Sequence, residues 1–407
     1  MQPQMPLHTK TSTSPNIFMQ ISDQAPDYIR AIAPYQPGKP IADIARAYGF
    51  REDQVVKLAS NENPLGMSPK AQMAMQEAAR DLGRYPDGNG FDLKAALVAR
   101  FGLQPEQITL GNGSNDILEM VAHAFLRPGT ESVMSAHAFA VYALASQAVG
   151  ARLVVVPAKP ADLGHDLEAM AKAVTPATTV VWLANPNNPT GSFIPGDQIH
   201  AFIRAMPASV LVVLDEAYTE YLPPEDRYPA LDWVQEFPNL LVSRSFSKAY
   251  GLAGLRVGYG VASTLVTDLL NRVRQPFNVN SLAQAAAAAA LTDHEFLDRS
   301  YALNRAGITQ LTKGLASFGI ACLPSWGNFV LADLSQLPQP GQRSGQALFE
   351  ALLAAGVITR PVQGYGLPAH LRISVGTRDE NAALLRAMPR ALARLAASAV
   401  SATRAGG

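Results

Sequence analysis

The feature that most constrains the fold is a regular alternation of apolar runs and helical stretches that begins near residue 130. Strands that are continuously apolar and alternate with helices form a parallel sheet with helices on both faces. The expected strands are rich in valine and leucine and lie at 131–134, 152–156, 179–183 and 210–214. The helices between them are expected at 139–149, 167–173 and 197–206. The sequence therefore predicts an α/β fold whose largest sheet is mostly parallel and covered by helices.

The composition of the 407 residues is that of an ordinary globular chain, with 48% hydrophobic and 16% charged residues. The formal net charge is +0, from 33 basic and 33 acidic residues, so the overall charge does not favour nucleic acid or an anionic membrane as a partner. No run is apolar and long enough for a transmembrane helix or a signal peptide. The single cysteine, Cys322, excludes an internal disulfide and fits a reducing compartment, so we expect a cytoplasmic protein.

The predicted elements divide the chain into an arm and two domains. Residues 1–40 are polar and rich in proline, and we expect them to form an N-terminal arm. Residues 65–290 are expected to form the large domain, and 41–64 together with 291–400 a smaller α/β domain. The elements expected in the smaller domain are strands near 320–323, 328–332 and 371–375 and helices at 296–317, 343–355 and 378–397.

A lysine between small hydroxyls and glycines lies in the segment 243–260, SRSFSKAYGLAGLRVGYG. The amine of Lys248 could form a Schiff base with a carbonyl group if it were held deprotonated. Ser245, Ser247 and Arg256 could contact a phosphate, the arginine through its fork of donors. A carbonyl and a phosphate on one ligand suggest pyridoxal phosphate. Taken alone, the segment fits a turn with a solvated lysine equally well.

A second candidate phosphate site precedes the helix expected at 117–124. Gly113, Ser114 and Asn115 lie directly before this helix. Glycines before a helix N-terminus expose backbone N–H groups, and the helix dipole favours an anion there. The same residue types also cap helices for purely structural reasons, so the segment alone leaves both interpretations open.

Polar side chains follow three of the predicted strands, where the catalytic groups of a parallel sheet lie. Asn188 comes after 179–183, Asp215 and Tyr218 come after 210–214, and Ser245 to Lys248 come after a third strand expected at 240–243. A buried aspartate needs a partner, and a cationic ring nitrogen would supply one while making the ring a better electron sink. Asn188 and Tyr218 are suited to hydrogen-bond a phenolic oxygen. A helix cap or ion pair for Asp215, and an Asn-Pro turn for Asn188, remain alternatives.

Three further polar residues are candidates for binding a substrate. Asn61 lies in the polar segment SNENP, where it is either a turn residue or an amide offered to a substrate, and the sequence favours the turn. Arg360 begins a strand-like segment, and Arg372 lies between leucine and isoleucine on an expected strand. A buried arginine needs an anionic partner. An anionic substrate group and a structural carboxylate both satisfy that need.

Taken together, these motifs resemble the signature of fold-type I pyridoxal-phosphate-dependent aminotransferases. The resemblance rests on Asn-Pro-Thr-Gly at 188–191, on Asp215 and Tyr218, and on Ser-Phe-Ser-Lys at 245–248 with Arg256. Their order and spacing agree with that class. Within it, the chain is similar to the histidinol-phosphate aminotransferase family over about residues 27–397. The stretches that support this closer resemblance lie at 34–41, 58–64, 84–86 and 371–379.

The resemblance implies a mostly parallel mixed sheet in the large domain, and transamination of histidinol phosphate with 2-oxoglutarate or glutamate in histidine biosynthesis. A broad aromatic amino-acid aminotransferase is one alternative. A phosphothreonine decarboxylase is another, because it shares the scaffold and a phosphorylated substrate. A non-enzymatic pyridoxal-phosphate-binding regulator is disfavoured, since no basic patch accompanies the core. Nicotinamide binding is disfavoured because the glycines follow the lysine rather than forming a strand–GxGxxG–helix unit.

The resemblance also implies roles for the cofactor-binding residues. Lys248 would carry the cofactor and move the substrate proton, and Asp215 would pair with the pyridine nitrogen. Asn188 and Tyr218 would hold the phenolic oxygen, and Phe139 would stack on the ring where the family often has tyrosine. The residues expected around the cofactor phosphate are Gly113, Ser114, Asn115, Ser245, Ser247 and Arg256.

The remaining implied roles concern the substrate and a second subunit. Tyr85 would reach the cofactor phosphate of the other subunit, so we expect a homodimer with shared sites. Arg372 would bind the carboxylate of glutamate or the phosphate of histidinol phosphate. Arg360, and Tyr35 from the arm of the other subunit, would assist at the distal anion, and Asn61 would also contact substrate. His137 has no role in this scheme, and no metal is expected.

Overall fold

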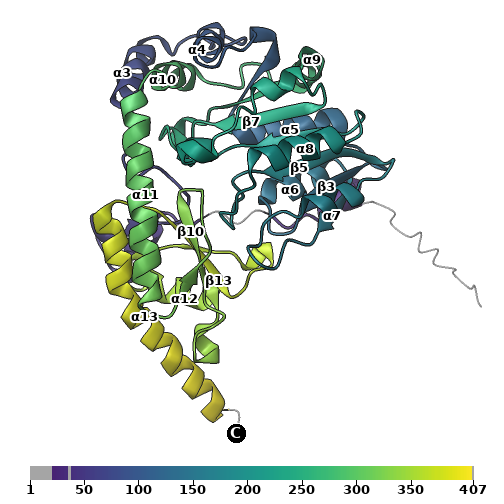
Figure 1. Cartoon of the computed structure of the whole chain (residues 1–407). Coiled ribbons are helices and arrows are strands. Elements are labelled where there is room, and N and C mark those ends of the chain that lie inside the picture. The colour runs from purple at the N-terminus through teal and green to yellow at the C-terminus, as the bar shows by residue number, and fades with distance from the viewer. Residues whose placement is uncertain (1–20, 35–37, 406–407) are drawn as a thin grey trace, which may run out of the picture.

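The computed structural model describes residues 21–34 and 38–405. Two sheets with separate hydrophobic cores dominate the fold. The long helix α11 (His294–Ala316) runs from the large domain, near α3 and α10, down to the small domain beside α13 (Figure 1). Its position explains how two cores far apart in sequence are held side by side.

The large sheet has seven strands in the order β2-β8-β7-β6-β5-β3-β4. Neighbouring strands are parallel except at β8, which is antiparallel to both β2 and β7. The predicted mostly parallel mixed sheet is therefore confirmed, and so are the four strands expected from the alternation. The strands are β2 (Ile108–Gly111), β3 (Glu131–Ser135), β4 (Arg152–Val156), β5 (Thr178–Ala184), β6 (Leu211–Asp215), β7 (Leu240–Ser245) and β8 (Gly258–Ala262).

Burial on both faces explains why the central strands are continuously apolar. In β6, Leu211 and Val213 pack into the core on one face, and Val212 and Leu214 into the core on the other. The first core includes residues of α5 (Ser114–Phe125), α6 (Ala140–Ala148) and α9 (Thr264–Val273). The second core includes residues of α3 (Pro69–Ala78), α4 (Phe91–Phe101), α7 (Leu167–Lys172), α8 (Gly196–Ala205) and α10 (Ser281–Ala290).

Two elements of the large domain were not predicted, and one predicted helix is shorter than expected. The strand β8 contains Gly258 and Gly260 because α5 lies against it. A Cβ at residue 258 would be 2.5 Å from the amide nitrogen of Ser114. The helix α4 was missed although left-handed glycines precede and follow it. Ser68 as a helix cap and Pro69 at the first helical position predict a helix over 68–83. The helix ends at Ala78 and continues only as a short 3-10 turn.

The small domain is built on a four-stranded antiparallel sheet in the order β12-β13-β10-β9. Its strands are β9 (Ala321–Cys322), β10 (Phe329–Asp333), β12 (Arg360–Pro361) and β13 (His370–Ser374). Its helices include α2 (Ile41–Tyr48), α12 (Gly345–Leu353) and α13 (Arg378–Ala405). The short strand β1 (Val56–Lys57) pairs with β11 (Val357–Ile358), which supports the proposal that 41–64 belongs with 291–400.

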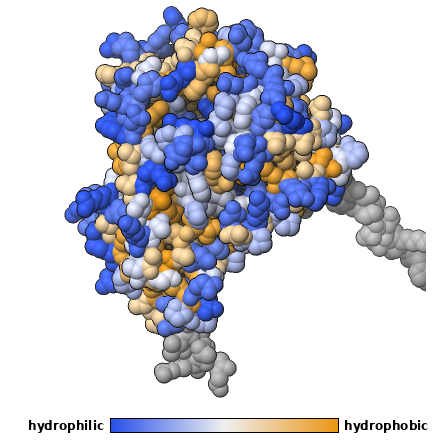
Figure 2. Space-filling view, viewed as in Figure 1, coloured by the Kyte–Doolittle hydropathy of each residue, from blue (hydrophilic) through white to orange (hydrophobic). Residues whose placement is uncertain are grey.

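Among the described residues, no helix combines the length and apolar character needed to cross a bilayer. Figure 2 shows hydrophilic residues over most of one face of the molecule, with apolar residues in patches between them. Within the same part of the chain, no group of three or more histidine, cysteine, aspartate or glutamate side chains is placed to hold a metal ion.

The close approach of two backbone segments at Gly251 leads to a prediction about stability. Gly251 has φ +72°, and a Cβ there would lie 1.9 Å from the carbonyl oxygen of Gly66. Gly319 has φ +75°, with open space around it. Gly319→Ala should cost about 1–2 kcal/mol of unfolding free energy, the penalty of a left-handed backbone alone. Gly251→Ala should cost more than twice as much, because the backbone at residue 66 must also move.

Thermal and urea unfolding of the two variants measure this difference. The matched pair separates the steric overlap from the conformational penalty, since both glycines have nearly the same φ. Equal shifts of the unfolding midpoint in the two variants would show that the contact between residues 66 and 251 is not as tight as described.

Candidate active site

A cavity of about 290 Å³ lies where the carboxyl ends of β5, β6 and β7 and the N-terminus of α5 meet the small domain. This is the edge of a parallel sheet at which ligands bind. The structure brings to it most of the residues proposed from the sequence. The proposed residues that line the cavity are Asn61, Ser114, Asn115, Phe139, Asn188, Asp215, Tyr218, Ser245, Ser247, Lys248, Arg256, Arg360 and Arg372.

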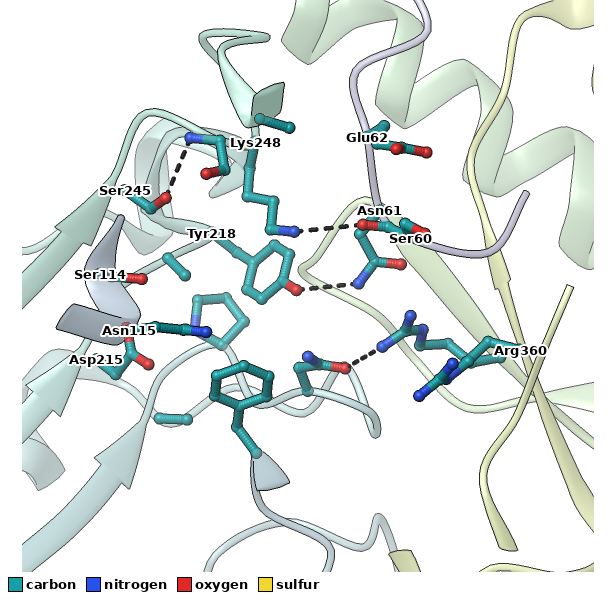
Figure 3. A pocket seen from close by; sticks show the side chains of 18 of the residues that line it. Ser60, Asn61, Glu62, Ser114, Asn115, Asp215, Tyr218, Ser245, Lys248 and Arg360 are labelled. Carbon is teal, nitrogen blue, oxygen red and sulfur yellow. Dashed lines mark hydrogen bonds between the residues drawn. The ribbon is translucent and has the colours of Figure 1, made fainter. Parts of the chain in front are cut away.

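The amine of Lys248 points into the cavity from the turn after β7 (Figure 3). Its Nζ donates a hydrogen bond to the backbone carbonyl of Ser60, at 3.3 Å, and lies 5.8 Å from the centre of the Tyr218 ring. Burial lowers the pKa of Lys248 to about 8, and the positive charge of Arg372 adds to the effect. A substantial fraction of this amine is therefore neutral near pH 8, as a nucleophile or proton acceptor requires. The solvated-turn alternative is wrong for this lysine.

The carboxylate of Asp215 is buried at the end of β6. Its Oδ2 accepts a hydrogen bond from the hydroxyl of Tyr142 at 2.8 Å. Its Oδ1 is buried and has no hydrogen-bond partner among the described residues. Burial raises the pKa of Asp215 to about 6, against the lowering effect of the Tyr142 hydrogen bond. An unpartnered buried carboxylate oxygen suits a cationic N–H donor from a ligand.

The side-chain amides of Asn61 and Asn188 and the phenol of Tyr218 line the same cavity as the carboxylate of Asp215. Asn61 donates a hydrogen bond of 2.9 Å to the hydroxyl of Tyr218. Burial raises the pKa of Tyr218 to about 12, so the phenol keeps its proton and can donate to a ligand oxygen. Asn61 has a left-handed backbone, with φ 55°, and its side chain lines the cavity.

Backbone amides, hydroxyls and a guanidinium gather at the N-terminus of α5. Nη1 of Arg256 donates to the hydroxyl of Ser247 at 3.2 Å, and Ser245 accepts a hydrogen bond from the backbone amide of Ser247. Gly113 precedes the helix with φ +80°, and a Cβ there would lie 2.4 Å from Nη2 of Arg256. Glycine therefore allows the guanidinium to lie directly over the helix N-terminus. Such a group of donors is an anion site.

Two arginines from the small domain form a second group of cationic donors in the cavity lining. Arg360 on β12 and Arg372 on β13 are directly opposite in the antiparallel register. Arg372 is buried and donates hydrogen bonds of 2.6 Å to the side chain of Asn188 and to the backbone carbonyl of Ala59. Since like charges opposite each other on a sheet repel, an anion bound beside both guanidinium groups is stabilised.

Three of the proposed residues are not among those that line this cavity. Gly113 lies directly before α5, with no room for a Cβ beside Arg256. Tyr35 lies outside the described residues. Tyr85 is 82% exposed and stacks on Phe277, with ring centroids 4.7 Å apart, rather than lining the cavity of its own chain. Its position is thus open to a neighbouring molecule.

Among the residues that line the cavity but were not proposed from the sequence are two tyrosines, Tyr142 and Tyr365. Tyr142 lies three residues after Phe139, about one helical turn, so the helical period of α6 could have indicated it. Its ring stacks on Trp182, with centroids 5.3 Å apart, which fixes the hydroxyl against Asp215. Tyr365 comes from a small-domain turn, and no local sequence signal indicates its contact with the large domain.

Three observations show that these groups fit pyridoxal phosphate. The unpartnered oxygen of Asp215 matches a protonated ring nitrogen. The lowered pKa of Lys248 matches reaction with an aldehyde. The donors around Arg256, packed so that Gly113 has no room for a Cβ, match a phosphate.

Comparisons with known proteins agree with the conclusion that these residues fit pyridoxal phosphate. The family model described as aminotransferase class I and II matches residues 53–388. The chain belongs to this family. The enzyme is therefore an aminotransferase of fold-type I that uses pyridoxal phosphate, as the sequence predicted.

Several relatives of this aminotransferase have curated names. The histidinol-phosphate aminotransferase 2 of Ralstonia nicotianae is 59% identical over 374 residues, which cover 92% of this chain and 98% of the relative. The histidinol-phosphate aminotransferase of Methylobacillus flagellatus is 56% identical over 373 residues, with coverage of 92% and 98%. These relatives confirm the predicted resemblance to the histidinol-phosphate aminotransferase family.

Solved structures of aminotransferases share its fold. The histidinol-phosphate aminotransferase from Sinorhizobium meliloti in complex with pyridoxal-5′-phosphate superposes with a TM-score of 0.82 and 30% identity, covering 91% of this chain and 97% of that one. The Thermus thermophilus aspartate aminotransferase with maleate gives a TM-score of 0.76 and 25% identity, with coverage of 91% and 99%.

The electrostatics of the site predict how Lys248 titrates in the cofactor-free aminotransferase. Only the neutral amine reacts with an acylating reagent, so labelling at Lys248 should rise with pH and reach half its plateau near pH 8. A free lysine does so near pH ~10.4. Arg372→Met should move the midpoint upward, because the charge of Arg372 helps lower this pKa. Peptide mass spectrometry measures the labelling.

The exposed arginine Arg378 provides the control for this titration. Arg378→Met should leave the midpoint unchanged. If labelling of Lys248 in the wild-type protein reached half its plateau at the pH expected for a free lysine, the described burial of Lys248 would be contradicted.

Proposed function

We propose that this aminotransferase exchanges the amino group of histidinol phosphate with 2-oxoglutarate or glutamate, as a step of histidine biosynthesis. The observation that carries the proposal is the pair of opposed arginines, Arg360 and Arg372, at the small-domain side of the cavity. Histidinol phosphate has no α-carboxylate, and its distal phosphate requires such a cationic site. The names of the relatives that are 53–59% identical support the same substrate.

The proposed roles of the catalytic residues follow from their positions. Bound pyridoxal phosphate supplies an electron sink for the negative charge that develops at the substrate α-carbon. Lys248 would hold the cofactor covalently at rest. Once the amino group of the substrate has displaced the Lys248 amine from that bond, the freed amine would take the proton from the α-carbon as a general base. The lowered pKa of Lys248 keeps the amine able to accept this proton near neutral pH.

In this proposal Asp215 contacts the ring nitrogen of the cofactor and Tyr218 contacts its phenolic oxygen. The carboxylate of Asp215, held by Tyr142, keeps the ring nitrogen protonated. Tyr218 and Asn188 orient the phenolic oxygen, and Phe139 stacks on the ring. The phosphate would be held by the group at the N-terminus of α5, which consists of Gly113, Ser114, Asn115, Ser245, Ser247 and Arg256.

We further propose that the enzyme is a homodimer in which Tyr85 reaches the cofactor phosphate of the other subunit. The exposure of Tyr85, and its absence from the lining of its own cavity, support this role. Large exposed apolar side chains accompany it between residues 73 and 91, namely Met73, Leu82 and Phe91. Tyr35 is proposed to approach the distal anion from the other subunit's arm. The proposed location is the cytoplasm, which the single cysteine supports.

Substrate choice is tested by Arg360→Ala in single-turnover reactions of the cofactor-loaded enzyme with histidinol phosphate and with phenylalanine. The variant should lose kcat/KM for histidinol phosphate on the order of 100-fold, because a desolvated charge pair with the phosphate is broken. Reaction with phenylalanine should change little, since its α-carboxylate needs only Arg372. Arg386→Ala, at an exposed position of α13, is the control and should match the wild type.

Two outcomes would favour other functions. Equal losses for histidinol phosphate and phenylalanine would contradict the phosphate role of Arg360 and indicate a broad aromatic aminotransferase. Release of carbon dioxide from phosphothreonine, without amino transfer, would indicate a decarboxylase.

Sharing of sites between subunits is tested by mixing two inactive variants. Tyr85→Ala and Lys248→Ala should each have low activity. In a mixed dimer one site then carries both changes and the other carries neither, so each mixed dimer should regain about half of the wild-type activity. Refolding the two variants together and assaying the mixture measures the recovery. No recovery would show that Tyr85 acts in its own subunit or that the sites are not shared.

A further inference from the structure

Two residues of the large domain that have a left-handed backbone, His137 and Leu163, contact one turn of the small domain, residues 362–367. Non-glycine residues with a left-handed backbone are uncommon, and retained strain points to a functional constraint. The described residues of this kind are Asn61, His137, Leu163, Arg256 and Phe277. Asn61 and Arg256 line the cavity. His137 and Leu163 do not, yet both contact the small-domain segment 362–367.

His137 joins the two domains by a hydrogen bond. Its Nδ1 lies 2.5 Å from the backbone carbonyl oxygen of Tyr365. Because a carbonyl only accepts, Nδ1 carries the proton and donates. On the other side, the carbonyl of His137 accepts a hydrogen bond from the side chain of Asn187 at 3.1 Å. These two hydrogen bonds connect the loop before α6 to the small-domain turn and to Asn187, which precedes Asn188.

The packing around this bond holds the turn from a second direction. Leu163 packs against the cluster formed by Leu331, Val362 and Leu367, and Tyr365 packs against the same cluster. At Gly366, with φ +76°, a Cβ would lie 3.4 Å from the imidazole ring of His137. The ring thus lies close against the turn, and the backbone of Tyr365 has little freedom to move away.

The side chain of Tyr365 extends from this turn into the cavity. It lines the cavity together with Arg360 and Arg372. It is also close enough to the large-domain phenols to contribute, after burial, to the raised pKa values of Tyr142 and Tyr218. A hydroxyl is therefore placed near the reacting groups by a contact made across the domain boundary.

We propose that Tyr365 is a specificity-determining residue whose hydroxyl donates a hydrogen bond to an anionic oxygen of the phosphorylated substrate. His137 is a positioning residue that holds Tyr365 in place through the hydrogen bond to its backbone. The inference rests on the proposed function, because the assay uses histidinol phosphate. Neither residue has a role in the scheme derived from the family resemblance.

The test compares four variants of the cofactor-loaded enzyme by their kcat and KM for histidinol phosphate. Tyr365→Phe should raise KM about tenfold, the loss expected for a hydrogen bond to a charged group, with kcat within about twofold. His137→Gly removes the donor and relieves the left-handed strain, and it should raise KM similarly. His137→Asn should restore most of the affinity, because asparagine keeps an amide donor and tolerates this backbone.

The double variant His137→Gly/Tyr365→Phe decides whether the two residues act as one unit. Its KM should be no higher than that of Tyr365→Phe, since both changes remove the same substrate contact. His123→Asn, at an exposed position of α5, is the control and should keep the wild-type KM. The absorbance of the bound cofactor and the unfolding midpoint show whether each variant is folded. Tyr365→Phe alone remains decisive if the histidine variants do not fold.

Each negative outcome has a distinct meaning. An unchanged KM in Tyr365→Phe would overturn the substrate role of Tyr365. Fully additive effects in the double variant, or no rescue by asparagine, would overturn the positioning role of His137. A wild-type enzyme that fails to react with histidinol phosphate would instead contradict the proposed function itself.

Discussion

The structure depends first on the burial of the central parallel strands on both faces. A strand such as β6 has no solvent-facing side, so its polar residues can lie only where the strand ends. Asp215 ends β6, Asn188 follows β5, and Lys248 follows β7. One packing constraint thus brings three reactive or hydrogen-bonding side chains to a single edge of the sheet, in the order of the strands.

The charge of the cavity contrasts with that of the whole chain. The formal net charge of the protein is +0, yet the described cavity lining holds four cationic side chains and two carboxylates. The cationic side chains are Lys248, Arg256, Arg360 and Arg372. Burial, together with the positive charges of Arg372 and Arg256, lowers the pKa of Lys248, and the repulsion between these charges is relieved when anions bind. The excess of positive charge in the cavity therefore helps to keep the amine of Lys248 neutral and reactive, and it favours ligands that carry phosphate or carboxylate groups.

The sequence predicted the parts of the fold and site that local pattern controls. Apolar runs located the central strands, and the polar residues after them located Asp215 and Lys248. The pattern missed β8, because its glycines are needed for the close approach of α5 rather than for strand propensity. It also missed Tyr142, whose role depends on stacking against Trp182, and Tyr365, whose role depends on how the two domains meet. The contact of Tyr365 with the large domain is set by tertiary packing and leaves no local spacing signal, whereas the helical period of α6 could have indicated Tyr142.

We infer that Lys248 is the residue that holds the cofactor at the edge of the sheet. Reduction of the cofactor-loaded protein with borohydride, followed by digestion and peptide mass spectrometry, tests it most directly. We expect a pyridoxyl group on the peptide that contains Lys248 and on no other lysine. A pyridoxyl group on a different lysine, or on none, would contradict it.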